Sequence, residues 1–320
     1  MRRIPRFLTS LCLTLLFAVT ALTPCVSAAG TPASHTPDQI RSYFNSHPVD
    51  LSMEPQFTET PSWTAPYRAG KTTLETQQNA LNMLNRYRYI AGLSEVSLSN
   101  DYIAKAQAGA VLTARNNVMN HTPARPADMS KSLYDAAYQG TSHGNLCDAG
   151  DNVANSVETY LHDFNVTSMG HRRWCLNPAM KYTGFGYAGR YSVMYAHDTG
   201  NAGAPQRAVA WPAPNMPVDQ FLWYEMWTYS CDQTIDASRV KVTLTRLSDN
   251  KKWVFSKSHA DGKFAVDNQA MGLPGCVSFL PCDPNDSFTG ERPVAGARYR
   301  VDLTGLNGGN VSYTIQFFDR

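Results

Sequence analysis

Hydrophobic positions in the first half of the chain recur at helical spacing. Residues 73–91 predict the clearest helix, whose apolar face would carry Ala80, Leu81, Leu84, Tyr87 and Ala91. Thr72 and Glu75 have the spacing of a capping box, and Gly92 can end a helix. The same periodicity predicts helices over about 100–117 and 152–164, and a short one over 36–45.

Short apolar runs follow these helices, over residues 184–188 and 191–196, with Gly189 and Arg190 between them. Helices followed closely by short strands predict an α+β layered domain. After a turn-rich stretch at 198–201, apolar and polar residues alternate with a period of two, as in half-buried antiparallel strands. We therefore expect an N-terminal extension over 29–72, a layered domain over 73–202 and an all-β sandwich-like domain over 203–320.

Residues 1–28 have the order of a secretory signal peptide. A basic head is followed by an apolar stretch from Leu8 to Leu22 and by small residues that end at Ala28. A spanning helix needs about 20 apolar residues, and no later segment of the sequence reaches that length. The sequence predicts a secreted protein; the alternative is a surface lipoprotein anchored through Cys25, although Pro24 stands where a small residue is expected.

Charge and cysteine content narrow the possible partners. Residues 1–28 hold three of the 28 basic residues and none of the 26 acidic ones, so the remainder is close to neutral and no nucleic-acid partner is expected. Export permits disulfides, and the most local pairing joins Cys147 with Cys175 and Cys276 with Cys282. Sequence alone does not fix this connectivity.

Two histidines stand at predicted helix-to-loop junctions. His121 follows the second helix in MNHTP, and His171 follows the third in GHRRWCLNP. Two neutral imidazoles can hold a divalent ion such as Zn²⁺, with a carboxylate or water completing the shell. Asp163, eight positions before His171, could either bind the metal or fix an imidazole tautomer. Taken alone, such residues are more often structural or surface groups.

The stretch from Ala80 to about Asp198 resembles the CAP superfamily of cysteine-rich secretory, antigen 5 and pathogenesis-related 1 proteins, particularly its bacterial members. The resemblance lies in ordered motifs, with GHR-x-x-x-L-N-P the most specific: ALNMLNRYRYIAGL, NHTP, the helix with Val157 and Tyr160, GHRRWCLNP and GFGYA. It implies an α-β-α sandwich with a central cleft flanked by His121 and His171. The region after the domain resembles the β-rich module of some bacterial members.

Family members often add two glutamates to that cleft, and this chain departs from the pattern. The first belongs to a Gly-Glu-Asn motif, which Asn145 would match by its distance from the third helix and Asp151 by its local sequence. The second falls near Asp163. The resemblance therefore implies a metal site at His121, His171 and Asp163, with Asp151 and Asn145 as further candidates.

These residues leave several functions open. The first hypothesis is a binding protein that captures a divalent metal or small extracellular ligand and contacts an unknown extracellular or cell-surface partner, because no family motif places a nucleophile beside either histidine. The second is a metal-dependent hydrolase of peptidase type, in which Asp163 acts as base. Lipid binding is a minor alternative, and whether the protein is an enzyme stays open.

Two further patterns carry competing interpretations. The G-x-S-x-G match around Ser142 would need a strand before it and a helix after it, whereas residues 132–138 are polar. Three tryptophans could form an aromatic platform for glycan, but aromatic side chains on sandwich strands more often pack in the core: Trp211, Trp223 and Trp227.

Overall fold

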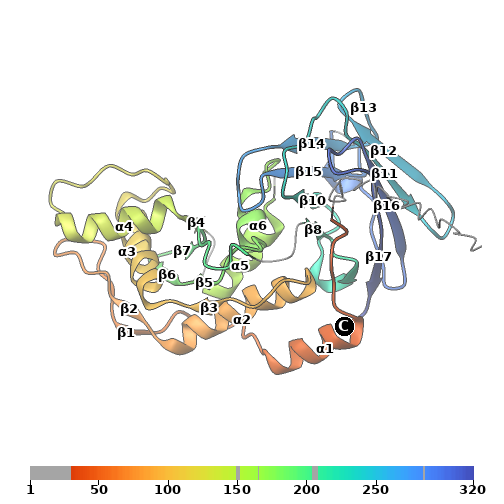
Figure 1. Cartoon of the computed structure of the whole chain (residues 1–320). Coiled ribbons are helices and arrows are strands. Elements are labelled where there is room, and N and C mark those ends of the chain that lie inside the picture. Colours follow the sequence, from red (N-terminus) through yellow and green to blue (C-terminus); the bar gives the residue numbers. More distant parts are fainter. Residues whose placement is uncertain (1–29, 149–151, 165, 204–207, 284) are drawn as a thin grey trace, which may run out of the picture.

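The structure is a computed structural model that describes residues 30–148, 152–164, 166–203, 208–283 and 285–320 (Figure 1). The predicted signal peptide, including Cys25, lies outside these ranges, and so does Asp151. No helix within them is long and apolar enough to cross a membrane.

The predicted helices all form, and side-chain caps define their starts. They are α1 (Pro37–Ser46), α2 (Leu74–Ile90), α3 (Asn100–Asn116) and α5 (Val153–His162). Thr73, not Thr72, caps α2, because its hydroxyl accepts from the Thr76 amide. Two helices that the sequence did not predict are α4 (Lys131–Ser142) and α6 (Gly170–Cys175).

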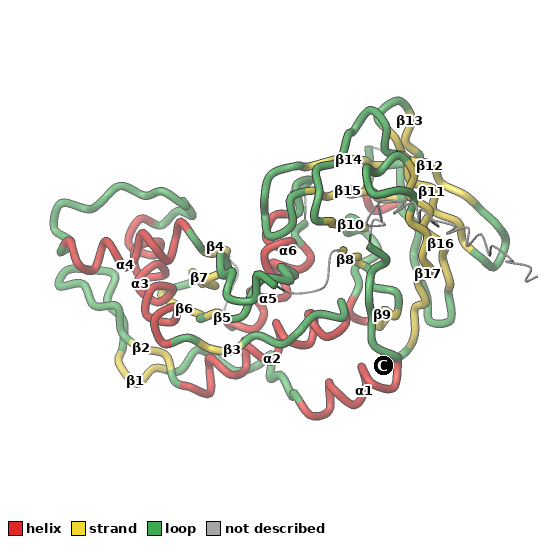
Figure 2. Tube along the Cα trace, in the orientation of Figure 1, coloured by secondary structure: helices red, strands yellow, loops and turns green. Residues whose placement is uncertain are grey.

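These helices enclose a small antiparallel sheet. Its strand order is β4 (Gly144–Asp148), β7 (Tyr191–Tyr195) and β6 (Phe185–Ala188). α3 and α4 pack on one face, and α5 packs on the other together with α2 (Figures 1 and 2). Two short ladders flank the sheet, β1 (Phe57–Glu59) with β2 (Lys71–Thr72) and β3 (Ser97–Leu98) with β5 (Tyr182–Thr183). The α-β-α layering is as predicted.

Two buried glutamine side chains complete the outer edge of strand β6. The amide of Gln77 accepts from the Phe185 N–H at 3.0 Å and donates to the Phe185 carbonyl at 2.6 Å. Gln107 makes the same pair with Tyr187, at 3.0 and 2.9 Å. Each amide thus replaces one residue of a neighbouring strand, which satisfies backbone groups that would otherwise be buried without partners.

The region after the layered domain forms two sheets. One orders β14 (Lys263–Asp267), β15 (Gly275–Leu280), β10 (Trp227–Cys231) and β8 (Ala208–Trp211). The other orders β13 (His259–Ala260), β12 (Lys252–Ser256), β11 (Lys241–Arg246), β16 (Arg298–Thr304), β17 (Val311–Phe318) and β9 (Asn215–Pro217). Aromatic side chains such as Phe279 and Phe317 fill the space between them. An α+β domain followed by a β-rich region is confirmed.

One hydrophobic core runs through both parts of the molecule. Tyr87 of α2 packs edge-on against Trp211 of β8, with ring centroids 5.7 Å apart. Helix α1 lies beside the C-terminal end of the chain, where Arg41 donates to the Asp319 carbonyl (Figure 1). The N-terminal extension is therefore packed against both parts.

The expected disulfides are not present: no two cysteines of the described residues are joined. Cys276 lies in β15 and Cys282 lies beyond its end, so the extended strand separates their α-carbons by more than the roughly 7 Å that a disulfide allows. The Cys175 sulfur instead accepts from the Asn145 amide at 3.4 Å. The predicted pairs Cys147–Cys175 and Cys276–Cys282 are therefore wrong for this structure.

The three tryptophans do not share a surface. Trp211 and Trp227 are 0% and 1% exposed and belong to the core. Trp223 is half-buried and contacts Tyr224, and the Arg292 guanidinium lies 3.8 Å from its ring centroid. Packing, the alternative considered above, therefore accounts for two of the three.

Candidate functional site

His121 lies in the loop after α3 and is held by a backbone carbonyl. Its Nδ1 is 2.8 Å from the Thr141 carbonyl oxygen, and the Thr141 hydroxyl donates back to the His121 carbonyl at 3.3 Å. A carbonyl oxygen only accepts, so Nδ1 carries the proton. The neutral imidazole then presents an unprotonated Nε2.

His171 is held in the same manner by a carboxylate. Asp163 ends α5 in the left-handed conformation with φ 45°, which Asp tolerates. Its Oδ1 lies 2.8 Å from His171 Nδ1, while Oδ2 accepts from the backbone N–H groups of His171 at 3.0 Å and Arg172 at 3.4 Å. One buried carboxylate thus caps the start of α6 and fixes the His171 ring with Nε2 unprotonated.

Asn145 stands on β4 directly behind His171. Its side-chain amide donates to the His171 carbonyl at 3.1 Å, and the Tyr160 hydroxyl donates to the Asn145 carbonyl at 3.1 Å. The Tyr160 ring also stacks on the His171 ring at 5.8 Å between centroids. Asn145 therefore supports the position of α6 and contributes a neutral group to the site.

The two histidines face one cleft with a volume of about 310 Å³. Among its described lining residues there is no Asp, Glu, Lys or Arg, so this wall carries no fixed charge. The lining residues are His121, Ser142, Gly144, Asn145, Val166, Ser168, Gly170, His171, Trp174, His197 and Met271.

Sequence reasoning missed His197, Trp174 and Met271. The His197 ring stacks on Trp174 with centroids 3.8 Å apart. Burial, together with neighbouring His143 and His121, lowers the pKa of His197 to about 4. His197 follows a predicted strand directly, and this position could have drawn attention to it. Met271 comes from the β-rich part, and no local pattern indicated it.

The donor atoms of the cleft fit a metal held by two imidazoles. Within the described ranges, no three His, Cys, Asp or Glu side chains group closely enough to hold an ion. Both oxygens of Asp163 already accept hydrogen bonds, which matches the tautomer-fixing role considered above. His121 and His171 are thus the candidate ligands, each with Nδ1 occupied and Nε2 available.

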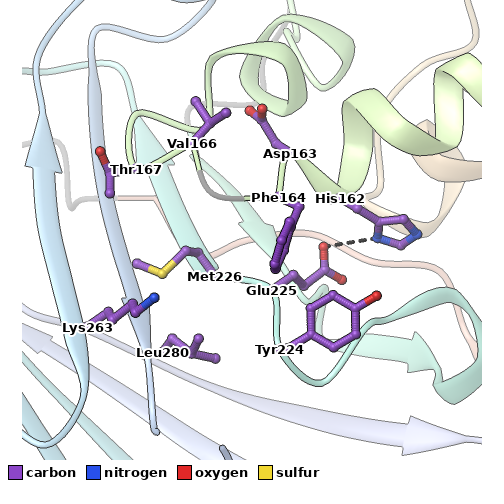
Figure 3. A pocket seen from close by; sticks show the side chains of 10 residues that line it. All are labelled: His162, Asp163, Phe164, Val166, Thr167, Tyr224, Glu225, Met226, Lys263 and Leu280. Atoms are coloured by element: carbon purple, nitrogen blue, oxygen red, sulfur yellow. Dashed lines mark hydrogen bonds and ion pairs between the residues drawn. The ribbon is translucent and has the colours of Figure 1, made fainter. Parts of the chain in front are cut away.

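A buried ionic network adjoins this cleft on the other side of Asp163 (Figure 3). His162 Nδ1 lies 3.1 Å from Glu225 Oε2, and Arg172 donates to the same oxygen at 2.6 Å. Burial alone would lower the pKa of His162, but the carboxylates of Glu225 and Glu158 outweigh it and raise the pKa to about 9. The network joins the layered domain to the β-rich part.

Ser142 does not form a nucleophile elbow. It is the last residue of helix α4, and strand β4 begins two residues later, so the elements stand in the reverse of the required order. Its hydroxyl lies 2.6 Å from the Tyr138 carbonyl, to which it donates.

The three-layer domain and its two-histidine cleft define the class of protein: an α-β-α sandwich domain with a candidate ligand site between its layers. The family model described as "Cysteine-rich secretory protein family", or CAP, matches residues 81–199. The chain therefore belongs to the CAP superfamily through this domain. No curated protein and no solved structure matches the chain significantly.

Proposed function

We propose that the chain is an extracellular binding protein whose cleft holds a transition-metal ion or a small ligand between His121 and His171. The observation that carries this proposal is the shared hydrogen-bonding state of the two imidazoles. Each Nδ1 is engaged by an oxygen acceptor, so each Nε2 is left with a lone pair on a common cleft. A bound metal would supply a Lewis-acidic centre there.

Export is part of the same proposal. The order of charge, apolar stretch and small residues over 1–28 supports cleavage after Ala28. The partner would then be an extracellular or cell-surface molecule.

The geometry supports binding better than hydrolysis. A metal-dependent hydrolase would need a base near the metal-bound water, and Asp163 is 3% exposed with both oxygens accepting hydrogen bonds from residues 171 and 172. The His121 and His171 arrangement supplies ligands rather than a base.

Calorimetric titration with Zn²⁺ and Cd²⁺ tests the proposal. We expect micromolar or tighter binding that is lost in the double variant His121→Ala/His171→Ala. The matched control is His259→Ala, since His259 is exposed and lies on β13 of the β-rich part, and it should bind as the unsubstituted protein does. Equal binding by the double variant and the control would refute the proposed site.

A further inference from the structure

Met271 brings a sulfur atom to the cleft from the β-rich part of the molecule. It lies in the connection between β14 and β15 and lines the cleft together with His121 and His171. A Cβ atom placed on Gly170 would lie 2.7 Å from the Met271 sulfur, which is closer than real Cβ contacts. The absent side chain at Gly170, directly before His171, is what admits the thioether here.

Several contacts fix the loop that carries Met271. Arg173, whose side chain is 1% exposed, donates to the carbonyls of Gln269 at 2.5 Å and Leu273 at 2.9 Å, one on each side of Met271. The same guanidinium donates to Asp267 at 2.7 Å. Gly272 adopts φ +76° and packs against Asn177, where a Cβ would approach to 2.9 Å. The thioether is therefore held in place by the layered domain.

The chemistry of these donors differs from that of a zinc or calcium site. Ca²⁺ and Mg²⁺ require oxygen ligands, and none of the described lining residues is a carboxylate. Zn²⁺ prefers four ligands, often including an anionic one. Cu(I) is monovalent, is stable with two or three ligands, and favours thioether sulfur and imidazole nitrogen.

We propose that Met271 is a specificity-determining residue that directs the cleft toward Cu(I) in preference to Zn²⁺. This inference rests on the proposed function, because it takes His121 and His171 as the other two ligands. It assigns to the β-rich part a direct role in ligand choice at the CAP cleft.

Competition titrations test this assignment. Cu(I) affinity is measured anaerobically against a chromophoric chelator, and Zn²⁺ affinity by calorimetry, in a Cys282→Ser background because Cys282 is a partly exposed thiol. We expect Met271→Leu, which preserves volume without the thioether, to weaken Cu(I) binding about tenfold or more while leaving Zn²⁺ affinity within about twofold. The matched control is Met53→Leu on the N-terminal extension, which should change neither affinity.

Each outcome separates this inference from the proposed function. X-ray absorption at the copper edge should show a sulfur neighbour that disappears in Met271→Leu. If Zn²⁺ binds through the two histidines but Cu(I) affinity is the same in Met271→Leu, Met271 does not set specificity and the proposed function survives. If neither metal binds, both are overturned. Thermal unfolding of each variant confirms that the fold is retained.

Discussion

At the scale of single residues, the hydrogen bonds of Asp163 determine how His171 can act. The sequence placed Asp163 near the site but left open whether it binds metal or orients an imidazole. That choice depends on the left-handed backbone at Asp163 and the turn that follows, which direct its carboxylate to the start of α6. Neither feature leaves a pattern in the sequence, whereas His121 and His171 were recognisable from their motifs.

Asp163→Asn tests the orienting role. Asn also tolerates the left-handed conformation, so the fold should be retained, but a neutral amide holds the Nδ1 proton of His171 more weakly. We predict a loss of metal affinity of about tenfold, in the range seen when groups that orient metal ligands are replaced. Calorimetry with Zn²⁺ measures it, and unchanged affinity would show that the carboxylate is not needed to orient His171.

At the scale of elements, amphipathic helices and alternating strands were predictable because one side of each faces a core. α2, α3 and α5 were placed within one to two residues of their ends. Helix α4 was missed because residues 132–138 read as polar, although Ser130 caps it and Ala137, Gly140 and Thr141 form its buried face. Helix α6, with six residues, is too short to show a period.

The glutamine pairs at the edge of β6 lead to a prediction about stability. Gln107→Leu removes both partners of the Tyr187 backbone groups and leaves them buried without hydrogen bonds. We expect the free energy of unfolding to fall by about 2–3 kcal/mol. Urea denaturation monitored by circular dichroism measures the change. Gln78→Leu, on the exposed side of α2, is the control and should fall by less than about 0.5 kcal/mol.

At the scale of the whole molecule, contacts between the two parts were outside the reach of sequence reasoning. Arg172 donates to the Met226 carbonyl at 2.5 Å and to the Glu225 carboxylate, more than fifty residues away. Such partners share no local spacing, so the boundary expected near residue 202 gave no sign that core packing continues across it. Met271 went unnoticed for the same reason.

The His162–Glu225 pair makes this junction sensitive to pH. The pKa of His162 rises from 6.5 to about 9 on folding, so between these values the folded state binds more protons than the unfolded state. The stabilisation is complete below about pH 6.5 and is lost as the pH rises through 9. We predict that the free energy of unfolding decreases over this window, and less steeply in His162→Gln. Parallel urea titrations at several pH values measure it, and equal slopes in the two proteins would contradict the pairing.

The central claim is that His121 and His171 form one ligand site, and the most direct measurement is anomalous X-ray diffraction from crystals grown with Zn²⁺. The account predicts an anomalous peak about 2.0–2.1 Å from Nε2 of both histidines, with His171 Nδ1 still bound to Asp163. A peak elsewhere on the protein, with the Nε2 atoms of His121 and His171 uncoordinated, would contradict it.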